Sequence, residues 1–214
     1  MTLARLRASM LHMKAPPIII VLGLKGGSGK STLAIHLAVC SKRRVLLADT
    51  DPQATVMAWA KARELPEPTV KAVRSYDLAT TVKSTNGHYD LMVVDTAPRI
   101  DADVPALARL ASLIVIPVRA SMPDLVASQT AFRLAQGSKR PFTVVLNATD
   151  GRTPEVSEAH ALLAKHYDVA PVMLGQRIAF SRALATGRAV SEFEPAGKAN
   201  EEITALWSYL ERKL

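Results

Sequence analysis

The first constraint on this chain comes from how little cysteine it contains. Its 214 residues include one cysteine, Cys40. A single cysteine cannot build a disulfide framework, and it also excludes an iron–sulfur cluster bridging a two-fold dimer, which needs at least two cysteines per chain. Cys40 falls on the apolar side of a predicted helix, so we expect it to serve packing.

Long apolar runs and a signal peptide are also missing. No stretch of eighteen apolar residues occurs, whereas a membrane-spanning helix needs about twenty, and we therefore expect a cytoplasmic protein. Aromatic residues make up 5% of the chain and do not alternate with basic ones, so nothing indicates stacking on bases. The 49% hydrophobic content over this length suits one α/β domain.

Acidic residues are outnumbered by basic ones. The chain carries 27 Lys and Arg against 19 Asp and Glu, a net charge of +8, which favours a polyanionic partner such as DNA or an anionic membrane surface. Residues 1–16 stand apart, with Arg5, Arg7 and Lys14 set among Leu and Met. They fit a basic amphipathic helix or a flexible tail. We expect a flexible tail before a single domain at 17–214.

A glycine-rich loop is the strongest motif. Residues 25–31 read KGGSGKS, between an apolar run at 18–22 and a helical pattern. This setting predicts a phosphate-binding loop between a buried strand and a helix. The backbone N–H groups of Gly26, Gly27, Ser28 and Gly29 would converge on phosphate oxygens, and Lys30 would supply a cation for the β- and γ-phosphates. The chain is predicted to bind a nucleoside triphosphate.

The loop departs from the ordinary pattern at its start. A glycine is expected five residues before the Gly-Lys pair, but Leu24 holds that place and Lys25 follows it. Lys25 is poorly placed for the phosphates of its own subunit, yet it could reach those of a partner across a two-fold interface. The loop therefore indicates a nucleotide-sandwich dimer.

The remaining pattern predicts the fold. Apolar runs alternate with helical segments, which is typical of a doubly wound, mostly parallel sheet with helices on both faces and ligands at the carboxyl ends of its strands. We expect strands at 17–22, 45–49, 69–73, 91–94, 113–118, 142–146 and, more weakly, 172–174. Helices are expected at 31–41, 54–63, 77–83, 104–111, 124–134, 154–165 and 200–214.

Three carboxylates fall at predicted strand ends. Asp95 closes an apolar strand, where it would face the loop and hold Mg²⁺ directly or through water, beside the Ser31 hydroxyl. Asp49 and Asp51 end the neighbouring strand and would point into the same crevice. We assign Asp49 to the metal side and Asp51 to the attacking water.

These motifs together resemble a known family. KGGSGKS at 25–31, DTDPQ at 49–53 and VVDTAP at 93–98 look like the deviant Walker A, Walker A′ and Walker B motifs of the ParA/MinD group of P-loop ATPases. The compact length and the segment 116–124 look most like the short ParA proteins typified by ParF. The resemblance covers 17–214 and implies an ATPase with ATP and Mg²⁺ as its cofactors.

The resemblance implies roles in the loop itself. Lys25 matches the signature lysine that reaches into the other subunit, and Gly26 matches the tight glycine at the dimer face. Lys30, Ser31 and Thr32 match the contacts to phosphate and Mg²⁺.

Outside the loop, the resemblance implies three further roles. Asp51 matches the hydrolytic aspartate and Asp95 the Walker B residue. Asn147, at the end of a predicted strand, resembles the asparagine that reads the adenine edge; taken alone, an Asn there fits a strand terminator equally well.

The family also implies partners. Its members bind DNA without sequence preference once ATP has closed the homodimer, through basic residues of the C-terminal region. The candidates here are Arg177, Arg182, Arg188 and Lys198, with Arg177 and Lys198 as the first choices. The implied function is a nucleoid-associated DNA-partition ATPase whose hydrolysis is stimulated by a ParB-like or ParG-like adaptor.

Two alternatives share the same motifs. A ParA-like ATPase can position another cargo, such as carboxysomes or a chemoreceptor array. A MinD-like membrane ATPase is expected to end in a basic amphipathic helix, whereas residues 201–210 open with two glutamates. We therefore expect no stable membrane association.

Overall fold

The computed structural model describes residues 15–85, 87–99, 102–151 and 153–214. Within them the chain forms one sheet of six strands in the order β3-β2-β4-β1-β5-β6, and every strand pairing is parallel. The strands are β1 Ile18–Val21, β2 Val45–Asp49, β3 Thr69–Ala72, β4 Leu91–Asp95, β5 Leu113–Val118 and β6 Phe142–Leu146. The predicted α/β, doubly wound fold is confirmed. The predicted N-terminal extension lies almost entirely outside the described residues.

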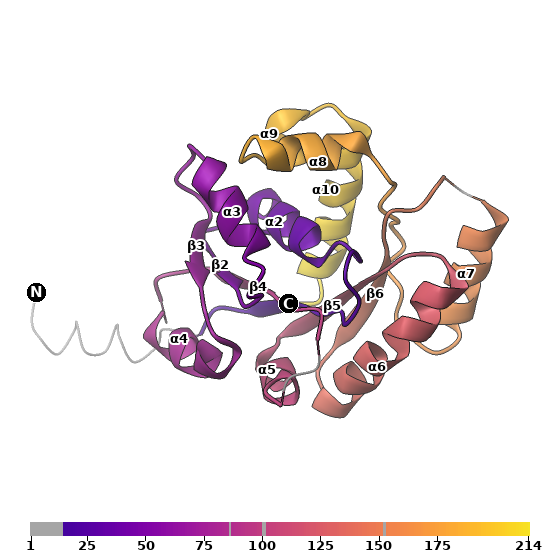
Figure 1. Ribbon diagram of the computed structural model, residues 1–214, viewed down its shortest axis with the longest axis horizontal. Helices are drawn as coiled ribbons and strands as arrows, with labels where there is room; N and C mark the ends of the chain where they lie inside the picture. The colour runs from indigo at the N-terminus through magenta and orange to yellow at the C-terminus, as the bar shows by residue number, and fades with distance from the viewer. Residues whose placement is uncertain (1–14, 86, 100–101, 152) are drawn as a thin grey trace, which may run out of the picture.

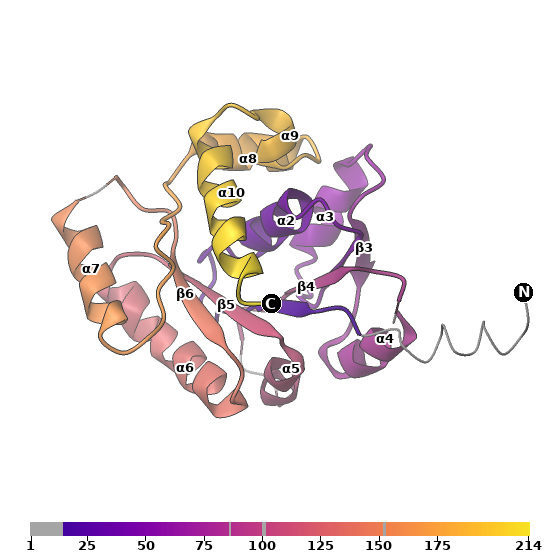
Figure 2. The same ribbon diagram turned by 180° about the vertical axis from the view of Figure 1, so that it is seen from behind.

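Helices cover both faces of the sheet (Figure 1). They are α2 Lys30–Cys40, α3 Thr55–Ala62, α4 Leu78–Ser84, α5 Val104–Leu110, α6 Met122–Ser138, α7 Pro154–Ala164, α8 Ile178–Ala185, α9 Val190–Phe193 and α10 Lys198–Glu211, with a 3₁₀ turn at Ser75–Asp77. Helices α2, α3, α8, α9 and α10 lie on one side, and α4 to α7 lie on the other (Figure 2).

Two hydrophobic cores follow from the strand period. Ile19 and Val21 of β1 face the core beneath α2 and α10, whereas Ile18 and Ile20 face the core beneath α5 and α6. Because both faces are covered, the central strands are continuously apolar rather than alternating. This burial explains why short apolar runs predicted the strands well.

The carboxyl-terminal helix packs into the first of these cores. Ile203, Leu206, Trp207 and Leu210 of α10 are buried there, and Cys40 of α2 lies nearby, with its sulfur 3.8 Å from the Thr204 hydroxyl. The predicted packing role of Cys40 is confirmed. Among the described residues, the structure has no helix long and apolar enough to cross a membrane.

The structure differs from the prediction at two places after β6. The weak strand expected at 172–174 is absent; the segment makes only isolated bridges, Val144 with Val169 and Thr149 with Gly175. The N–H of Ala170 donates to Val144 at 2.8 Å, but the next donor to β6 is Leu174, which donates to Leu146 at 2.9 Å. Four residues of this segment thus span two residues of β6, so no continuous ladder forms. The sequence analysis also missed α8 and α9, which are too short for a clear helical period.

Candidate nucleotide site

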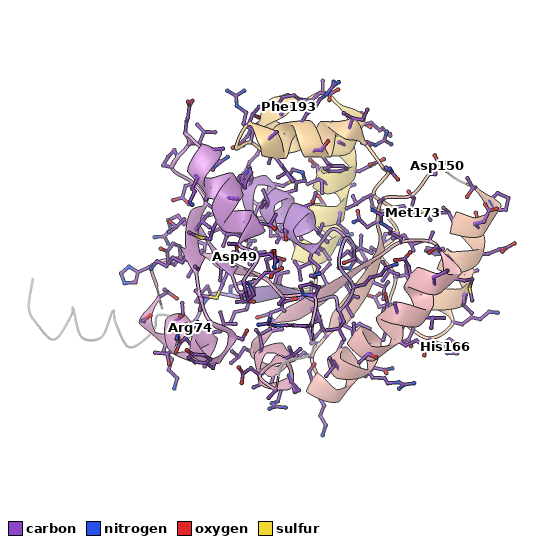
Figure 3. All side chains as sticks on the ribbon, viewed as in Figure 1. Asp49, Arg74, Asp150, His166, Met173 and Phe193 are labelled. Atoms are coloured by element: carbon purple, nitrogen blue, oxygen red, sulfur yellow. The ribbon has the colours of Figure 1, made fainter. Side chains whose placement is uncertain are left out.

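Neighbouring strands bring the predicted nucleotide residues to one edge of the sheet. β4 lies between β2 and β1, and its last residue, Asp95, is in register with Asp49 on one side and Val21 on the other. The loop at 22–29 leaves β1 at this level and enters α2. Figure 3 shows Asp49 among side chains near the centre of the molecule. The edge holds the crevice where doubly wound sheets bind ligands.

The glycine-rich loop has the backbone that phosphate binding needs. Gly27 and Gly29 have φ values of 74° and 91°, a region that glycine enters at little cost. Lys25, Gly26 and Gly27 are exposed, whereas Lys30 is buried and donates to the Lys25 carbonyl at 3.1 Å. Burial lowers the pKa of Lys30, and the negative charges of Asp95 and Asp51 oppose that shift. The loop thus encloses a cation beside two carboxylates.

Asp95 is a fully buried carboxylate without a hydrogen-bond partner in the described part of the chain. Loss of hydration raises the pKa of Asp95 to about 7, and the nearby Ser31 hydroxyl and Lys30 charge only partly oppose this rise. An unpartnered buried carboxylate beside a hydroxyl fits the oxygen ligands that Mg²⁺ prefers.

Mg²⁺ would share its coordination with the phosphates. The described residues hold no cluster of three or more His, Cys, Asp or Glu side chains arranged for a metal. Mg²⁺ is commonly held by one or two carboxylates together with water and substrate phosphates. The donor set around Asp95 and Ser31 therefore fits a metal that binds with a nucleotide.

Asp49 and Asp51 shape the loop that follows β2. The Asp49 carboxylate accepts the backbone N–H groups of Asp51 at 3.1 Å and Met57 at 3.0 Å, so both of its oxygens hold the loop against α3. Burial raises the pKa of Asp49, and these hydrogen bonds counteract it. Asp51 accepts the Gln53 N–H at 3.0 Å. Asp49 thus acts on the loop backbone, while Asp51 borders open space.

That open space is a cavity of about 640 Å³ at the carboxyl ends of β2 and β3. Its walls include Asp49, Asp51, Arg74 and Tyr76. The Arg74 guanidinium lies over the Tyr76 ring, 5.8 Å from its centroid, and Tyr76 is 59% exposed. Asp51 is therefore accessible through this cavity.

Lys25 has a partner that sequence reasoning missed. Its ammonium lies 2.5 Å from Oδ1 of Asp124, in the first turn of α6. The Ser121 hydroxyl, which caps this helix, donates to the other oxygen of Asp124 at 2.5 Å. These contacts hold the pKa of Asp124 below its usual range despite its burial. Only the fold reveals the pair, because 99 residues separate Lys25 from Asp124.

Asn147 follows β6 and reaches the glycine-rich loop. Its amide nitrogen donates to the Ser28 carbonyl at 2.7 Å, and its own backbone N–H donates to Val118 at the end of β5, at 2.8 Å. The structure therefore brings Asn147 together with the loop residues.

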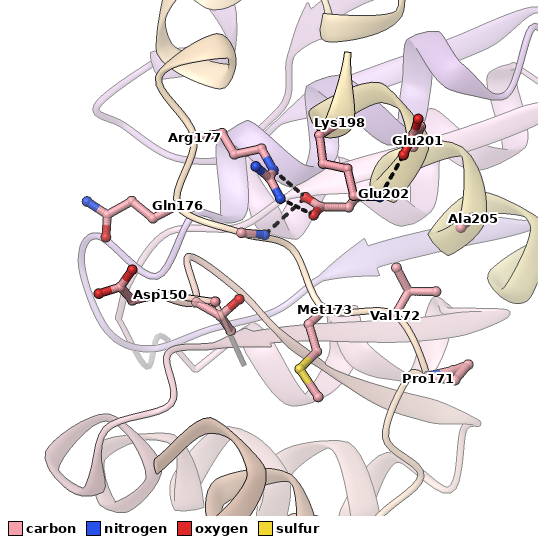
Figure 4. Close-up of a pocket in the computed structure, with 13 residues that line it drawn as sticks. Asp150, Pro171, Val172, Met173, Gln176, Arg177, Lys198, Glu201, Glu202 and Ala205 are labelled. Atoms are coloured by element: carbon pink, nitrogen blue, oxygen red, sulfur yellow. Dashed lines mark hydrogen bonds and ion pairs between the residues drawn. The ribbon is translucent and has the colours of Figure 1, made fainter. Parts of the chain in front are cut away.

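The four predicted DNA-binding residues lie away from the loop and differ in their surroundings. Arg177 makes a two-pronged pair with Glu202, at 2.6 and 3.0 Å, and Lys198 pairs with Glu201 at 2.7 Å (Figure 4). Both pairs line a cavity of about 680 Å³ between α10 and the loop after β6.

The other two candidates carry no such partner. Arg182 and Arg188 are exposed, and their side chains make no hydrogen bond or ion pair with the described residues. They flank the turn between α8 and α9, where the Arg188 N–H donates to Ala183 at 3.0 Å. The structure thus divides the four cations into two paired and two unpaired.

Comparison with known proteins gives one family. Residues 19–190 match the family described as the CobQ/CobB/MinD/ParA nucleotide binding domain. Among curated proteins, the chain is 35% identical over 152 residues to the maintenance of carboxysome distribution protein A of Gloeobacter kilaueensis. It is also 28% identical over 123 residues to Protein ParA of Rhizobium radiobacter. The alignments span 64% and 55% of this chain, and 66% and 55% of those relatives.

Solved structures share the fold at low identity. An ATP complex of Cyanothece McdA superposes with a TM-score of 0.76 at 14% identity, covering 94% of this chain and 96% of that one. A plasmid partition protein of Borrelia burgdorferi bound to AMPPNP gives 0.74 at 17%, covering 93% and 100%. The cell division ATPase MinD of Pyrococcus furiosus gives 0.73 at 15%, covering 92% and 99%.

Proposed function

Since the chain belongs to the CobQ/CobB/MinD/ParA nucleotide-binding family, we propose that it is a ParA-type ATPase that binds ATP with Mg²⁺ and hydrolyses it as a slow switch. The observation that carries the proposal is the meeting of the deviant loop, Lys25 to Ser31, with Asp51 and Asp95 at one edge of the sheet. Phosphoryl transfer to water requires backbone N–H groups that bind the phosphates, a lysine beside them, and carboxylates that hold the metal and orient the water. All of these groups lie at this edge of the sheet.

Each residue has a distinct task in this reaction. The loop N–H groups and Lys30 bind the phosphates and stabilise the charge that develops on them. Ser31 and Asp95 would hold Mg²⁺, which when bound neutralises phosphate charge. Asp51 orients the attacking water. Asp49, whose oxygens bind backbone N–H groups, keeps Asp51 and the start of α3 in place.

The active species in this proposal is a homodimer closed across two nucleotides. The exposed loop at 25–27 and the half-exposed Lys25 support this arrangement. Within one chain Lys25 is bound to Asp124, so it must leave that carboxylate to reach a nucleotide in the other subunit. Closure of the dimer would thereby replace the Lys25–Asp124 ion pair with a contact between Lys25 and the phosphates bound to the other subunit.

We further propose that the closed dimer binds nucleoid DNA and that a ParB-like or ParG-like adaptor triggers its release. Support comes from the net charge of +8 and from exposed arginines around α8. The relative named ParA and the structural likeness to a plasmid partition protein favour the same role.

A second candidate is the positioning of a cargo other than a plasmid. The relative at 35% identity is named for the maintenance of carboxysome distribution. Both functions would use the same nucleotide motifs, so in this proposal they differ in the adaptor and the cargo. Identifying the protein that stimulates hydrolysis would separate them.

The first test is DNA retention of the purified protein with ATP, with ADP and without nucleotide, at two salt concentrations. We expect retention only with ATP and weaker retention at high salt, because phosphate contacts release counterions. Liposomes of anionic lipid serve as the control surface. ATP-dependent binding to liposomes without binding to DNA would replace this function with a membrane-associated one.

Two variants test the assigned chemistry. Asp51→Ala should bind ATP and trap the dimer while stopping turnover, and normal turnover would overturn the role of Asp51. Lys25→Gln should lose ATP-dependent dimerisation; if it retains ATP binding, dimerisation and DNA binding alike, the sandwich arrangement is wrong. Analytical ultracentrifugation and phosphate release measure the two effects.

A further inference from the structure

Asn147 is anchored more firmly than a loop residue normally is. It directly follows β6, and its N–H continues the hydrogen bonding of the sheet to the Val118 carbonyl at 2.8 Å. Ala148 then turns the chain with a φ of 51°. The Asn147 side chain therefore projects from the end of a rigid strand, where positioning groups are most accurate.

The contact of this side chain with the glycine-rich loop is close and directional. The Asn147 amide nitrogen donates to the Ser28 carbonyl at 2.7 Å, across 119 residues of sequence. A Cβ atom built on Gly29 would lie 2.1 Å from the same nitrogen. The amide thus occupies the space that any side chain at position 29 would need.

This hydrogen bond sets the orientation of one peptide group. The Ser28 carbonyl and the Gly29 N–H belong to the same planar peptide and point in opposite directions. Holding the carbonyl toward β6 directs the Gly29 N–H to the other side, into the curve of the loop where phosphate binds. Gly29 has a φ of 91°, and such a flexible residue gains most from an external restraint.

We propose that Asn147 is a positioning residue for the phosphate loop, which it holds in its binding conformation through the Ser28 carbonyl. The proposal rests on the proposed binding of a nucleoside triphosphate to this loop. It assigns Asn147 a contribution to phosphate affinity that is independent of the nucleotide base.

The decisive probe is a phosphate chain without a base. The affinities of Mg²⁺-tripolyphosphate and Mg²⁺-ATP are measured by calorimetry for the wild type, Asn147→Ala and the uncharged, similarly sized Asn147→Leu, which cannot donate this hydrogen bond. We expect each variant to bind both ligands about 10-fold more weakly than the wild type does. The loss should be similar for tripolyphosphate and for ATP. Unchanged tripolyphosphate affinity with weakened ATP affinity would overturn the proposal and make Asn147 a reader of the base.

A matched control comes from the same turn. Thr149 lies two residues from Asn147, and its hydroxyl donates to the Leu174 carbonyl at 3.2 Å rather than to the loop. Thr149→Val should leave both affinities unchanged. Equal losses in Thr149→Val and Asn147→Ala would show that the turn as a whole, rather than the amide, matters, and would also overturn the proposal.

Hydrogen exchange provides a readout that needs no ligand. Amides at 26–30 should exchange faster in Asn147→Ala than in the wild type and should be unchanged in Thr149→Val. Unaltered exchange in Asn147→Ala would contradict the inference. If the wild type bound neither tripolyphosphate nor ATP, the proposed function would fail, while exchange would still decide whether Asn147 restrains the loop.

Discussion

At the scale of single residues, the burial of Asp95 in the candidate site lowers the stability of the folded protein. Asp95 is fully buried with neither oxygen hydrogen-bonded to a described residue, and its pKa rises to about 7. Such a group costs stability when it is ionised, because burial removes its hydration. Binding sites tolerate this cost, since the ligand later supplies the missing interactions.

Replacing this carboxylate should therefore stabilise the protein while removing the proposed Mg²⁺ ligand. We expect Asp95→Asn to raise the free energy of unfolding at pH 8 by about 2 kcal/mol, or roughly 5 °C in Tm. At pH 5.5 the folded Asp95 is protonated, because its pKa is about 7, but the unfolded carboxyl, whose ordinary pKa is about 4, is still ionised. The gain should therefore shrink to about half at pH 5.5 and vanish only below about pH 4, where both states are protonated. Thermal unfolding at both pH values checks this, and equal gains at both would contradict it. Mg²⁺-dependent nucleotide binding should be lost in the variant.

The Lys25–Asp124 pair bears on dimer formation. In Asp124→Asn, Lys25 is no longer held by a charge in its own chain, so ATP-dependent dimerisation should tighten about 2- to 5-fold, the effect expected of a partly exposed ion pair. Sedimentation in an Asp51→Ala background, which prevents turnover, measures it. Asp90→Asn, which breaks the exposed pair with Arg44, is the control. Weaker dimerisation would show that Asp124 itself contributes to the interface.

At the scale of elements, α2 connects the nucleotide loop to the helices on its face of the sheet. His36 lies in the middle of α2, fully buried, with its ring 5.0 Å from that of Phe180 in α8. Neither ring nitrogen has a hydrogen-bond partner among the described residues. Burial lowers the pKa of His36 to about 3, so the packing of α2 against α8 requires a neutral ring.

This packing predicts acid sensitivity. Below pH 6.5 the unfolded chain protonates His36 while the folded chain does not, so this residue makes stability fall as the pH drops from 6.5 toward 3. At pH 5 the loss is about 2 kcal/mol. His36→Leu should therefore gain stability relative to the wild type as the pH falls from 7.5 to 5, measured by urea unfolding.

The exposed His166 provides the control for that comparison. The matched variant His166→Leu should show the same difference from the wild type at both pH values. Because each variant is compared with the wild type at the same pH, the titration of Asp95 cancels. A His36→Leu difference that did not depend on pH would contradict a buried, neutral His36.

At the scale of the whole molecule, the basic residues that the structure describes fall into two groups, those that form ion pairs with described residues and those that do not. Arg177 and Lys198 face glutamates on α10, and Arg43, Arg44 and Arg63 are also in ion pairs. A cation that is already paired with a carboxylate neutralises less phosphate charge, so fewer counterions leave the DNA when it binds. The unpaired Arg182 and Arg188 are therefore the stronger candidates for a DNA surface.

We expect the double variant Arg182→Glu with Arg188→Glu to lose most ATP-dependent DNA binding. A milder version, both to Gln, should reduce the slope of log K against log salt by about 2, since each arginine contacts about one phosphate. The matched pair Arg177→Gln with Lys198→Gln should change the slope less. A larger effect in this second pair would place the DNA surface near α10. ATPase activity checks that the variants fold.

The sequence by itself was sufficient to predict the sheet, the glycine-rich loop and the positions of the carboxylates at the strand ends. Buried parallel strands are continuously apolar, and the loop has a local spacing, so both can be recognised without long-range information. The family followed from the same motifs. Local patterns also predicted all six strands of the sheet within one or two residues.

Only the tertiary structure decided which side chains meet. The Lys25–Asp124 pair, the hydrogen bond from Asn147 to Ser28 and the Arg177–Glu202 pair join residues 99, 119 and 25 positions apart. Their formation depends on strand order and helix placement, which no local spacing encodes. The short helices α8 and α9 are stabilised by burial of Ala183 and Val190 against α2 and α3, because helices of eight and four residues are not stable through their own propensity.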